Sequence, residues 1–400
     1  MKILQITHKP PVPSVDGGCL AMSQITSCLL SAGVDVKVVS VSTAKHPIIA
    51  SNEFVEYQEK TNFESVFIDT KITVCKIIAA LIKNSSLQAN RFISKEMNNK
   101  LKTVLLKEKF EVVILESVFV GNYIETIRKY SQARIFLRVH NIEYLIWKRL
   151  AKQTKNLFKK AAYSYLACTL KRFELSLFNK IEGYLPITEV DHTFFKAKFP
   201  NLRSKAIPFS IKLSDYQYHE PEIEDNKISL FHLGSMIWQP NIEGMIWFLD
   251  NVWKTMAEKY PQLSFVIAGK GCKTMMNNKS YKNLQVFDFV EDAQQFIKEH
   301  DIMVVPLLSG SGMRIKIMEG LALGKPIITT SIGAEGIDIT DKENIFIADT
   351  PEEMIQSIGF CVKNVQKCEE IGKNARKLIE NKYTQEIITQ DLIEILKKEK

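Results

Sequence analysis

One segment, Asp301–Ile337, constrains the fold more than any other part of the chain. It opens with a short apolar run, Asp301–Leu307, which is long enough for a buried strand but too short for a helix. A glycine-containing loop follows, and Met313–Leu323 then carries apolar residues at helical spacing. Pro326–Thr330 is a second short apolar run. The order strand, glycine loop, helix, strand predicts two parallel strands joined by a right-handed crossover.

The loop and the start of this helix have the chemistry of an anion site. Closely spaced glycines let backbone N–H groups turn toward one point, and the amino end of a helix adds a positive dipole. Arg314 and Lys316 add two cations, and Glu319 offers a carboxylate that can accept two hydroxyl hydrogen bonds, as from a ribose diol. The loop residues are Gly310, Ser311 and Gly312. A solvated helix face with charges placed at random is the alternative interpretation.

These residues carry a resemblance to a known family. The pattern P-L-x-x-G-S-G-x-R-x-K-x-x-E-x-L-A-x-G-x-P begins at Pro306 and is similar to the donor-site signature of GT-B fold, family-4-like retaining glycosyltransferases (glycosyl transferases group 1). The resemblance implies that Arg314 and Lys316 hold the diphosphate of a nucleotide sugar and act in catalysis. It also implies that Glu319 holds the ribose, that configuration is retained, and that neither a metal nor a cofactor beyond the donor is needed.

The chain departs from the family pattern at two places. The first acid of the family's Glu-(seven residues)-Glu motif would fall at Ser311, which puts the usual contact with a sugar hydroxyl in doubt. The loop that starts at Gly234 lacks the Arg and Lys that many branches of the family place there. Arg314 and Lys316 would therefore have to carry the diphosphate charge themselves.

Four hundred residues exceed what one hydrophobic core usually serves, so we expect two domains. The resemblance implies an α/β protein of the GT-B fold, with two Rossmann-like domains that face each other across a cleft. We expect an acceptor-side domain at 1–207, joined by a C-terminal helix at 385–400, and a nucleotide-sugar domain at 208–384. The acidic segment Ile211–Asn226 lacks periodicity and is expected to link them.

The remaining strands are predicted clearly, whereas the order of elements in residues 45–110 is not. Short apolar runs predict strands at 34–41, 111–116, 134–139, 183–188, 228–233, 263–268, 284–287 and 344–347. Residues 45–110 give no clear order of elements, although Val74–Ile82 is apolar and Arg91–Lys109 is expected to be a basic helix. Pro240 is expected at the first position of a helix that runs on to Lys259.

The first domain contributes three candidate site residues. Gly17 and Gly18 follow the predicted strand Lys2–Thr7 and open a helix, which alone indicates only a helix start, because the dinucleotide pattern G-x-G-x-x-G is absent. His140 directly follows a predicted strand, at the edge where ligands bind in such sheets. The resemblance implies that the two glycines face the diphosphate and the acceptor, and that His140 contacts the transferred sugar or the acceptor. A structural histidine that bonds a loop is the alternative for His140.

Three more candidates lie in the second domain. The resemblance implies that Gly234 belongs to the donor site and that Val290 and Glu291 border the nucleotide base, whose edge the backbone would contact. Glu291 could equally be a first-turn acid of the helix that follows it and extends to Glu299.

Charge is distributed unevenly along the chain. Residues 1–206 carry a net charge of +14, whereas residues 207–400 carry −6. A basic half favours an anionic partner, such as a membrane surface or a lipid-phosphate acceptor. Within it, Tyr144–Lys160 interleaves basic and large apolar residues and continues into a helix at 161–179. This stretch could lie on the inner face of the cell membrane, or it could be an ordinary basic helix face. We expect no nucleic-acid partner, since no binding motif is present.

The expected location and activity follow from these observations. Seven cysteines form no C-x-x-C pair, and neither a signal peptide nor an apolar run of eighteen residues is present, so we expect a cytoplasmic protein. The resemblance implies transfer of a sugar from a nucleotide diphosphate sugar to a hydroxyl acceptor, which could be lipid-linked, in polysaccharide or glycolipid synthesis. A nucleotide-sugar 2-epimerase, a non-catalytic sugar-nucleotide binding protein and a nucleic-acid binder remain as alternatives. The base, the sugar and the acceptor are not specified by the sequence.

Overall fold

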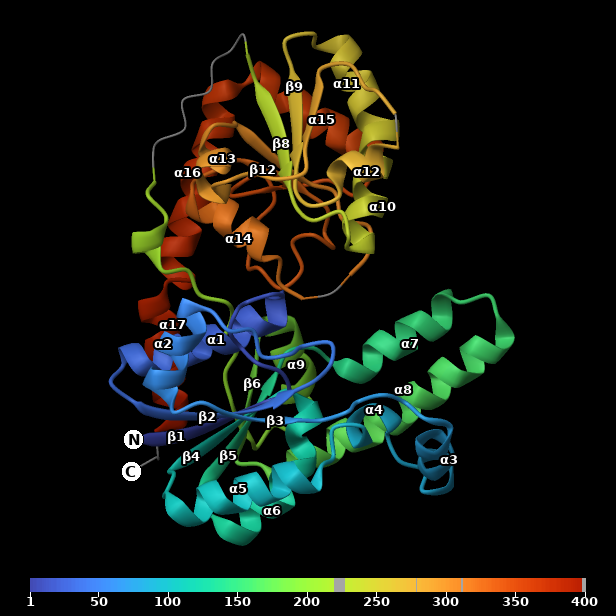
Figure 1. The fold of residues 1–400 in the computed structure, drawn as a ribbon. Helices are drawn as coiled ribbons and strands as arrows, with labels where there is room; N and C mark the ends of the chain where they lie inside the picture. The colour runs from blue at the N-terminus through green and yellow to red at the C-terminus, as the bar shows by residue number, and fades with distance from the viewer. Residues whose placement is uncertain (219–226, 278, 311, 398–400) are drawn as a thin grey trace. The chain divides into compact units, whose positions relative to one another are not determined.

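The computed structural model describes residues 1–218, 227–277, 279–310 and 312–397. The chain divides into two compact units, each built on a parallel β-sheet with helices around it (Figure 1). Unit 1 comprises Met1–Pro208 and Ile388–Lys400, and unit 2 comprises Phe209–Ile387. Among the described residues, no helix combines the length and the apolar character that a membrane span requires.

The sheet of unit 1, as far as the residues are described, has seven strands in the order β3-β2-β1-β4-β5-β6-β7. Its strands are β1 (Lys2–Thr7), β2 (Asp35–Ser42), β3 (Glu64–Phe67), β4 (Val112–Glu116), β5 (Arg134–Val139), β6 (Gly183–Pro186) and β7 (Arg203–Ser204). All neighbouring pairs are parallel, and the central strands are buried along almost their whole length, which explains their continuous apolar runs. The strand order reverses between β1 and β4, so the loops after these two strands form the switch point where α/β sheets bind ligands.

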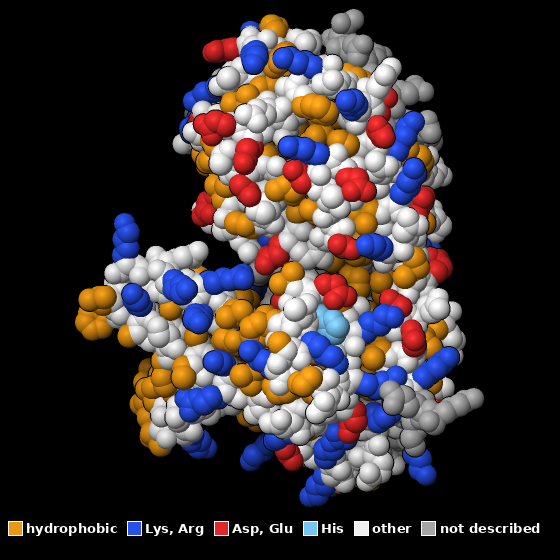
Figure 2. Space-filling view, turned by 180° about the vertical axis from the view of Figure 1, so that it is seen from behind, with side chains coloured by type: hydrophobic (Ala, Val, Ile, Leu, Met, Phe, Trp, Pro, Cys, Tyr) orange, Lys and Arg blue, Asp and Glu red, His pale blue; other side chains and the backbone are white. Residues whose placement is uncertain are grey.

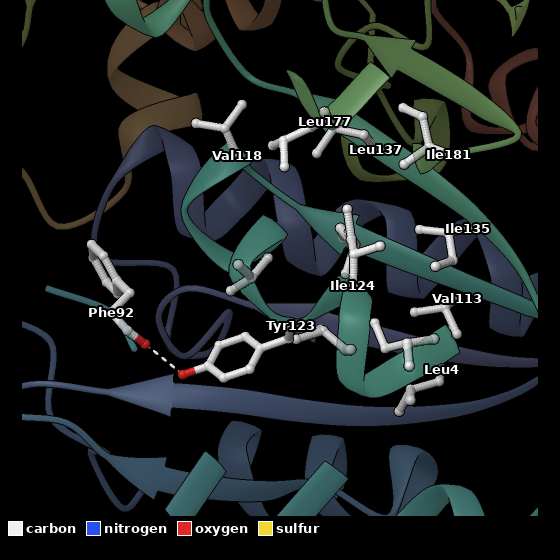
Figure 3. Packing of buried hydrophobic residues seen from close by; sticks show 14 of the residues in the cluster. Leu4, Phe92, Val113, Val118, Tyr123, Ile124, Ile135, Leu137, Leu177 and Ile181 are labelled. Atoms are coloured by element: carbon white, nitrogen blue, oxygen red, sulfur yellow. Dashed lines mark hydrogen bonds between the residues drawn. The ribbon is translucent and has the colours of Figure 1, made fainter. Parts of the chain in front are cut away.

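Helices on both faces complete unit 1. They are α1 (Gly17–Ser31), α2 (Asn52–Thr61), α3 (Val74–Ile82), α4 (Leu87–Asn90), α5 (Lys95–Lys107), α6 (Ile124–Tyr130), α7 (Glu143–Gln153), α8 (Leu157–Leu177), α9 (Glu189–Lys196) and the end of α17 (Gln385–Leu396), with 3-10 turns at Val118–Tyr123 and Phe178–Lys180. One core cluster lies beneath the 3-10 turn, where the Tyr123 hydroxyl donates to the Phe92 carbonyl (Figure 3). A second cluster includes Leu392 of α17 and Phe136 of β5.

The sheet of unit 2 has six strands among the described residues, in the order β10-β9-β8-β11-β12-β13. The strands are β8 (Ser229–Leu233), β9 (Ser264–Ala268), β10 (Leu284–Phe287), β11 (Ile302–Val305), β12 (Ile327–Thr329) and β13 (Phe346–Ile347). The helices are α10 (Gln239–Phe248), α11 (Lys254–Lys259), α12 (Cys272–Met276), α13 (Ala293–Lys298), α14 (Ile315–Ala322), α15 (Pro351–Lys363) and α16 (Val365–Lys382), with a 3-10 turn at Leu213–Asp215. The switch point lies between β8 and β11, whose following loops begin at Gly234 and after Val305.

The predicted crossover from β11 to β12 is confirmed, because these strands pair in parallel and α14 connects them. Gly324 has a φ of 70°, a left-handed conformation that suits the glycine predicted to end this helix. The stretch from Tyr144 onward was expected to continue into one helix, and this is wrong. The chain breaks between α7 and α8, because the Asn156 side chain accepts the N–H of Lys159 at 3.0 Å and starts a new helix.

Two further expectations need correction. Residues 45–110 contain an ordered helix, α2, and an edge strand, β3, whose short polar sequences give weak periodic signals. The helix predicted from Pro240 to Lys259 is interrupted by a π-helical turn at Leu249–Trp253, and Pro240 is its second residue. Of the expected linker, residues 219–226 lie outside the described residues.

Candidate functional site

The candidate donor site of unit 2 is assembled at the switch point of its sheet. The chain leaves β11 and turns through Gly310 and Gly312, whose φ values of 120° and 84° are left-handed conformations that favour glycine. Ser311 lies outside the described residues. Arg314 precedes α14 as its N-cap residue, and Lys316 is the second residue of the helix. The two cations therefore lie at the amino end of α14, where free N–H groups also gather.

Two polar side chains from the neighbouring loop hold Lys316. Its Nζ lies 3.3 Å from His232 Nε2 and 3.2 Å from Asn241 Oδ1. His232 Nδ1 lies 2.7 Å from the Val304 carbonyl oxygen, to which it must donate, so Nε2 is left as an acceptor for the lysine. Asn241 is itself oriented by its Nδ2, which donates to the Ser235 carbonyl at 2.8 Å. The lysine amine is thus positioned by acceptors that carry no charge.

Burial controls the charges in this group. Burial, reinforced by the neighbouring Arg314, lowers the pKa of the Lys316 amine to about 7. Burial also lowers the pKa of His232 well below its usual value, so this ring is neutral at physiological pH. No carboxylate forms an ion pair with Lys316 among the described residues. A bound anion would compensate for this burial and would favour the charged amine.

Arg314 and the glycines around it leave little room for larger side chains. The Arg314 guanidinium lies 5.3 Å from the centre of the Trp238 ring, over which it stacks. A Cβ at Gly310 would come within 2.7 Å of Arg314 Nη2. A Cβ at Gly234 would collide with Lys316 Nζ and would lie 2.9 Å from His232 Nε2. Both glycines thus let the backbone approach the two cations closely.

Glu319 lies one turn further along α14. The Tyr216 hydroxyl donates to its Oε1 at 3.1 Å, and burial raises the pKa of the Glu319 carboxyl. The second carboxylate oxygen is available to accept a hydroxyl hydrogen bond from a ligand. Tyr216 belongs to the segment that the sequence indicated only as a linker, so part of that segment contributes to the candidate site.

Val290 and Glu291 lie in the loop between β10 and α13. Asp292, the next residue, caps α13, because its side chain accepts the N–H groups of Gln294 at 2.8 Å and Gln295 at 3.1 Å. The reading of Glu291 as a first-turn acid is therefore wrong, and this residue is an exposed loop residue. Neither residue takes part in the hydrogen bonds that the described residues make around Lys316.

The candidates Gly17 and Gly18 begin α1, at the switch point of unit 1. Asp16 caps this helix, since its Oδ1 accepts the N–H of Cys19 at 2.9 Å. The same carboxylate pairs with Lys9 Nζ at 2.6 Å, and the pair holds the pKa of Asp16 well below its usual range despite partial burial. A Cβ at Gly18 would lie 2.8 Å from the Lys9 amine. The double glycine therefore allows Lys9 to lie against the start of α1.

His140 takes part in a buried polar cluster at the same edge of unit 1. Its Nε2 lies 2.8 Å from Oε2 of Glu116, a fully buried carboxylate at the end of β4. Gln5 Nε2 donates to the other oxygen of Glu116 at 2.9 Å, and Arg138 Nε lies 3.6 Å from Oε2. The His8 ring centre lies 5.9 Å from that of His140, and burial lowers the pKa of His8 to about 3. His140 is thus oriented by a buried carboxylate.

Two further acids, Glu143 and Glu174, lie together near the start of α7. The Glu174 carboxylate accepts the N–H groups of Glu143 at 3.2 Å and Tyr144 at 3.1 Å, at the start of α7. Burial raises the pKa of Glu143 to about 7 and that of Glu174 to about 8. Both carboxyl groups can therefore hold a proton near neutral pH.

Several residues of these two groups were absent from the sequence prediction, namely His8, Glu116, Tyr216, His232, Trp238 and Asn241. A signal for His232 existed, because it is the last residue but one of an apolar strand that leads to Gly234, as His140 follows such a strand. Tyr216 had no such signal, since its partner lies far along the chain. Among the described residues, no group of three or more His, Cys, Asp or Glu side chains is arranged to hold a metal ion.

Comparison with known proteins gives concordant findings. The family described as Glycosyl transferases group 1 matches residues 227–364, from β8 through α15. A 44.6 kDa protein in the cps region of Klebsiella pneumoniae is 22% identical over 401 residues, which cover 96% of each chain. HepE of Anabaena, solved in complex with UDP, covers 99% of both chains with a TM-score of 0.68 and 13% identity. Sucrose-phosphate synthase from Thermosynechococcus elongatus gives a TM-score of 0.68 at 13% identity, covering 99% of this chain and 98% of its own. The expected GT-B fold, with two Rossmann-like units, is confirmed.

Proposed function

We propose that this chain, whose residues 227–364 match the family described as Glycosyl transferases group 1, transfers a sugar from a nucleotide diphosphate sugar to a hydroxyl acceptor with retention of configuration. The observation that carries the proposal is the Lys316 amine, which is buried beside Arg314 at the amino end of α14 without a carboxylate partner among the described residues. A buried charged amine without a counter-ion is unfavourable in free energy, whereas a bound dianionic ligand would compensate for its charge.

In the proposed reaction, the bond between sugar C1 and the diphosphate oxygen breaks, and its electron pair stays on the diphosphate. The acceptor oxygen forms the new bond to C1 on the same face, and its proton passes to an oxygen of the leaving phosphate. Negative charge therefore grows on the diphosphate in the transition state. Lys316, Arg314 and the free N–H groups of α14 would stabilise that charge.

Glu319 would select the nucleoside part of the donor. Tyr216 occupies one carboxylate oxygen at 3.1 Å and fixes the orientation of the group. The other oxygen would accept hydrogen bonds from the ribose hydroxyls. This role would make Glu319 a binding residue rather than a group that assists bond breaking.

Two relatives guide the choice of substrates. HepE of Anabaena has been solved with UDP and with UDP-glucose, so uridine nucleotides are the first donors to test. The Klebsiella pneumoniae relative comes from a cps region, which supports a role of this chain in capsular or other cell-surface polysaccharide synthesis. We propose that the acceptor is a growing saccharide of such a polymer.

Isothermal titration calorimetry with UDP, GDP and ADP tests the donor site. Charge-assisted hydrogen bonds contribute roughly 1.5–3 kcal/mol each, so Lys316→Met should weaken binding of the preferred nucleotide about tenfold to a hundredfold. Glu319→Gln should weaken nucleoside diphosphate binding while leaving inorganic pyrophosphate binding unchanged. Lys363→Met, an exposed lysine of α15, is the matched control and should bind as the wild type does.

Equal affinity of the wild type and Lys316→Met for every nucleotide would contradict the proposal. Release of nucleoside diphosphate from the donor should depend on a saccharide acceptor and should fall in Lys316→Met at saturating donor. Consumption of the donor without an acceptor, with the sugar converted to its 2-epimer, would instead indicate an epimerase.

A further inference from the structure

The helix α3 of unit 1 turns an apolar face toward solvent. Its large aliphatic residues recur at spacings of three and four, the pattern by which a surface helix normally packs against a core. Here these residues are exposed: Val74 (70%), Ile77 (39%), Ile78 (50%), Leu81 (53%) and Ile82 (79%). Ala80, on the other face, is the buried residue of this helix. No other described residue of the unit covers this aliphatic stripe.

The opposite face of α3 is fixed to α8, so the orientation of the stripe is defined. The Tyr165 hydroxyl donates to the Ala80 carbonyl at 3.2 Å. Arg172, two turns further along α8, donates from Nη2 to Asn84 Oδ1 at 2.7 Å, just beyond the end of α3. Turning the stripe inward would break both contacts.

A second exposed apolar group lies at the turn between α7 and α8. Leu157 is 77% exposed and Phe158 is 89% exposed, although a phenylalanine is usually buried in a protein of this size. Trp147 and Tyr163, whose ring centres lie 5.8 Å apart, pack the two helices against each other. The helices form an arm that projects from the sheet, and Figure 2 shows hydrophobic side chains at its end with lysine and arginine beside them.

The charge around both groups has one sign. The segments 71–83 and 148–160 together hold nine lysine and arginine residues and no aspartate or glutamate. The cations of the arm are exposed, and none forms an ion pair with another described residue; they are Lys148, Arg149, Lys152, Lys155, Lys159 and Lys160. Exposed cations that surround exposed aliphatic side chains, with no ion pair to another described residue in the arm, match an anionic, apolar surface.

We propose that α3 and the α7–α8 turn together form a docking surface for an anionic lipid bilayer, called here the α3–α8 surface. The aliphatic stripe and Phe158 would enter the boundary between headgroups and acyl chains, and the lysines would contact lipid phosphates. A second copy of the chain fits less well. In a symmetric dimer the same face would meet itself, which would oppose nine cations to nine cations.

Vesicle flotation of the full-length protein tests this surface. The wild type should bind vesicles of phosphatidylglycerol and phosphatidylcholine in equal parts and should not bind vesicles of phosphatidylcholine alone, and its binding should weaken as salt is raised. The double variant Ile78→Glu/Ile82→Glu should lose about tenfold or more in binding constant. Lys155→Glu/Lys159→Glu should also weaken binding and should reduce its salt dependence.

Matched controls change the same residue types elsewhere in unit 1. Val55→Glu on α2 replaces an exposed aliphatic residue, and Lys107→Glu/Lys109→Glu reverses two exposed lysines at the end of α5. Both controls should bind vesicles as the wild type does, and all variants should keep the wild-type melting temperature. UDP calorimetry on the same variants reports on unit 2, so a failed lipid proposal can be told apart from a failed donor site.

Three results would overturn the proposal. The first is wild-type binding that does not depend on the anionic lipid. The second is vesicle binding by Ile78→Glu/Ile82→Glu that equals that of the wild type. The third is a wild-type dimer in light scattering that this double variant dissociates, since a second copy would then occupy the stripe.

Discussion

Burial lowers the pKa of the Lys316 amine to about 7, so at pH 8 most of the free protein holds this amine uncharged. A diphosphate would favour the charged form and raise the pKa again. We therefore predict that binding of a nucleoside diphosphate at pH 8 takes up about one proton. The measurement is titration calorimetry in buffers of different ionisation enthalpy. The uptake should vanish in Lys316→Met and should decrease toward pH 6, where the free amine is already protonated.

An uptake that is the same in Lys316→Met would assign the proton to another group. The ligand phosphate cannot be that group, because its second pKa is about 6 and nearby cations lower it further, so at pH 8 the phosphate stays deprotonated and takes up no proton. A proton uptake at pH 8 therefore reports on a group of the protein and not on the ligand.

At the scale of single residues, the sequence predicts the charged groups of the site but not the side chains that position them. Arg314, Lys316 and Glu319 belong to one helix, where local spacing predicts proximity. Asn241 and Tyr216 meet these residues only through the tertiary fold. Local periodicity carries no information about such contacts, because strand order decides which loops lie side by side.

At the scale of elements, the Gly234 loop should be intolerant of a side chain. Gly234→Ala would place a Cβ against the Lys316 amine and 2.9 Å from His232 Nε2, so the lysine must leave its acceptors. We predict a loss of about tenfold in nucleoside diphosphate affinity, roughly the contribution of one charge-assisted hydrogen bond. Calorimetry with the preferred nucleotide checks this. The control is Gly359→Ala in α15, where the nearest atom to the new Cβ is 3.5 Å away, and which should bind normally.

Strands that form short apolar runs were predicted well, as β1, β5 and β10 show with identical bounds. Elements in which the local pattern is weak, or competes with a capping residue, were not predicted correctly. Helix α7 ends at Gln153 and Asn156 caps the start of α8, yet the residues around this break continue the same amphipathic pattern. The strand β3 lies at a sheet edge and is only partly buried, so its sequence alternates little. In each case tertiary packing decides what the local sequence leaves open.

At the scale of the molecule, α17 links the end of the chain to the core of unit 1. Leu392 is fully buried in the cluster that contains Phe136. Leu392→Ala should lower the free energy of unfolding of unit 1 by about 2–5 kcal/mol. Urea unfolding measures this, and the transition of unit 1 is the one that added UDP does not shift.

Gln390→Ala, on the exposed side of the same helix, should leave both transitions unchanged. A loss of stability confined to the transition that responds to UDP would show that α17 supports unit 2 instead.

The position of α17 also has a consequence for synthesis on the ribosome. Unit 2 is one continuous run of residues, whereas unit 1 needs residues that are translated after all of it. The amino-terminal sheet therefore keeps an uncovered apolar face until α17 has been translated, and unit 2 can reach its native state before unit 1.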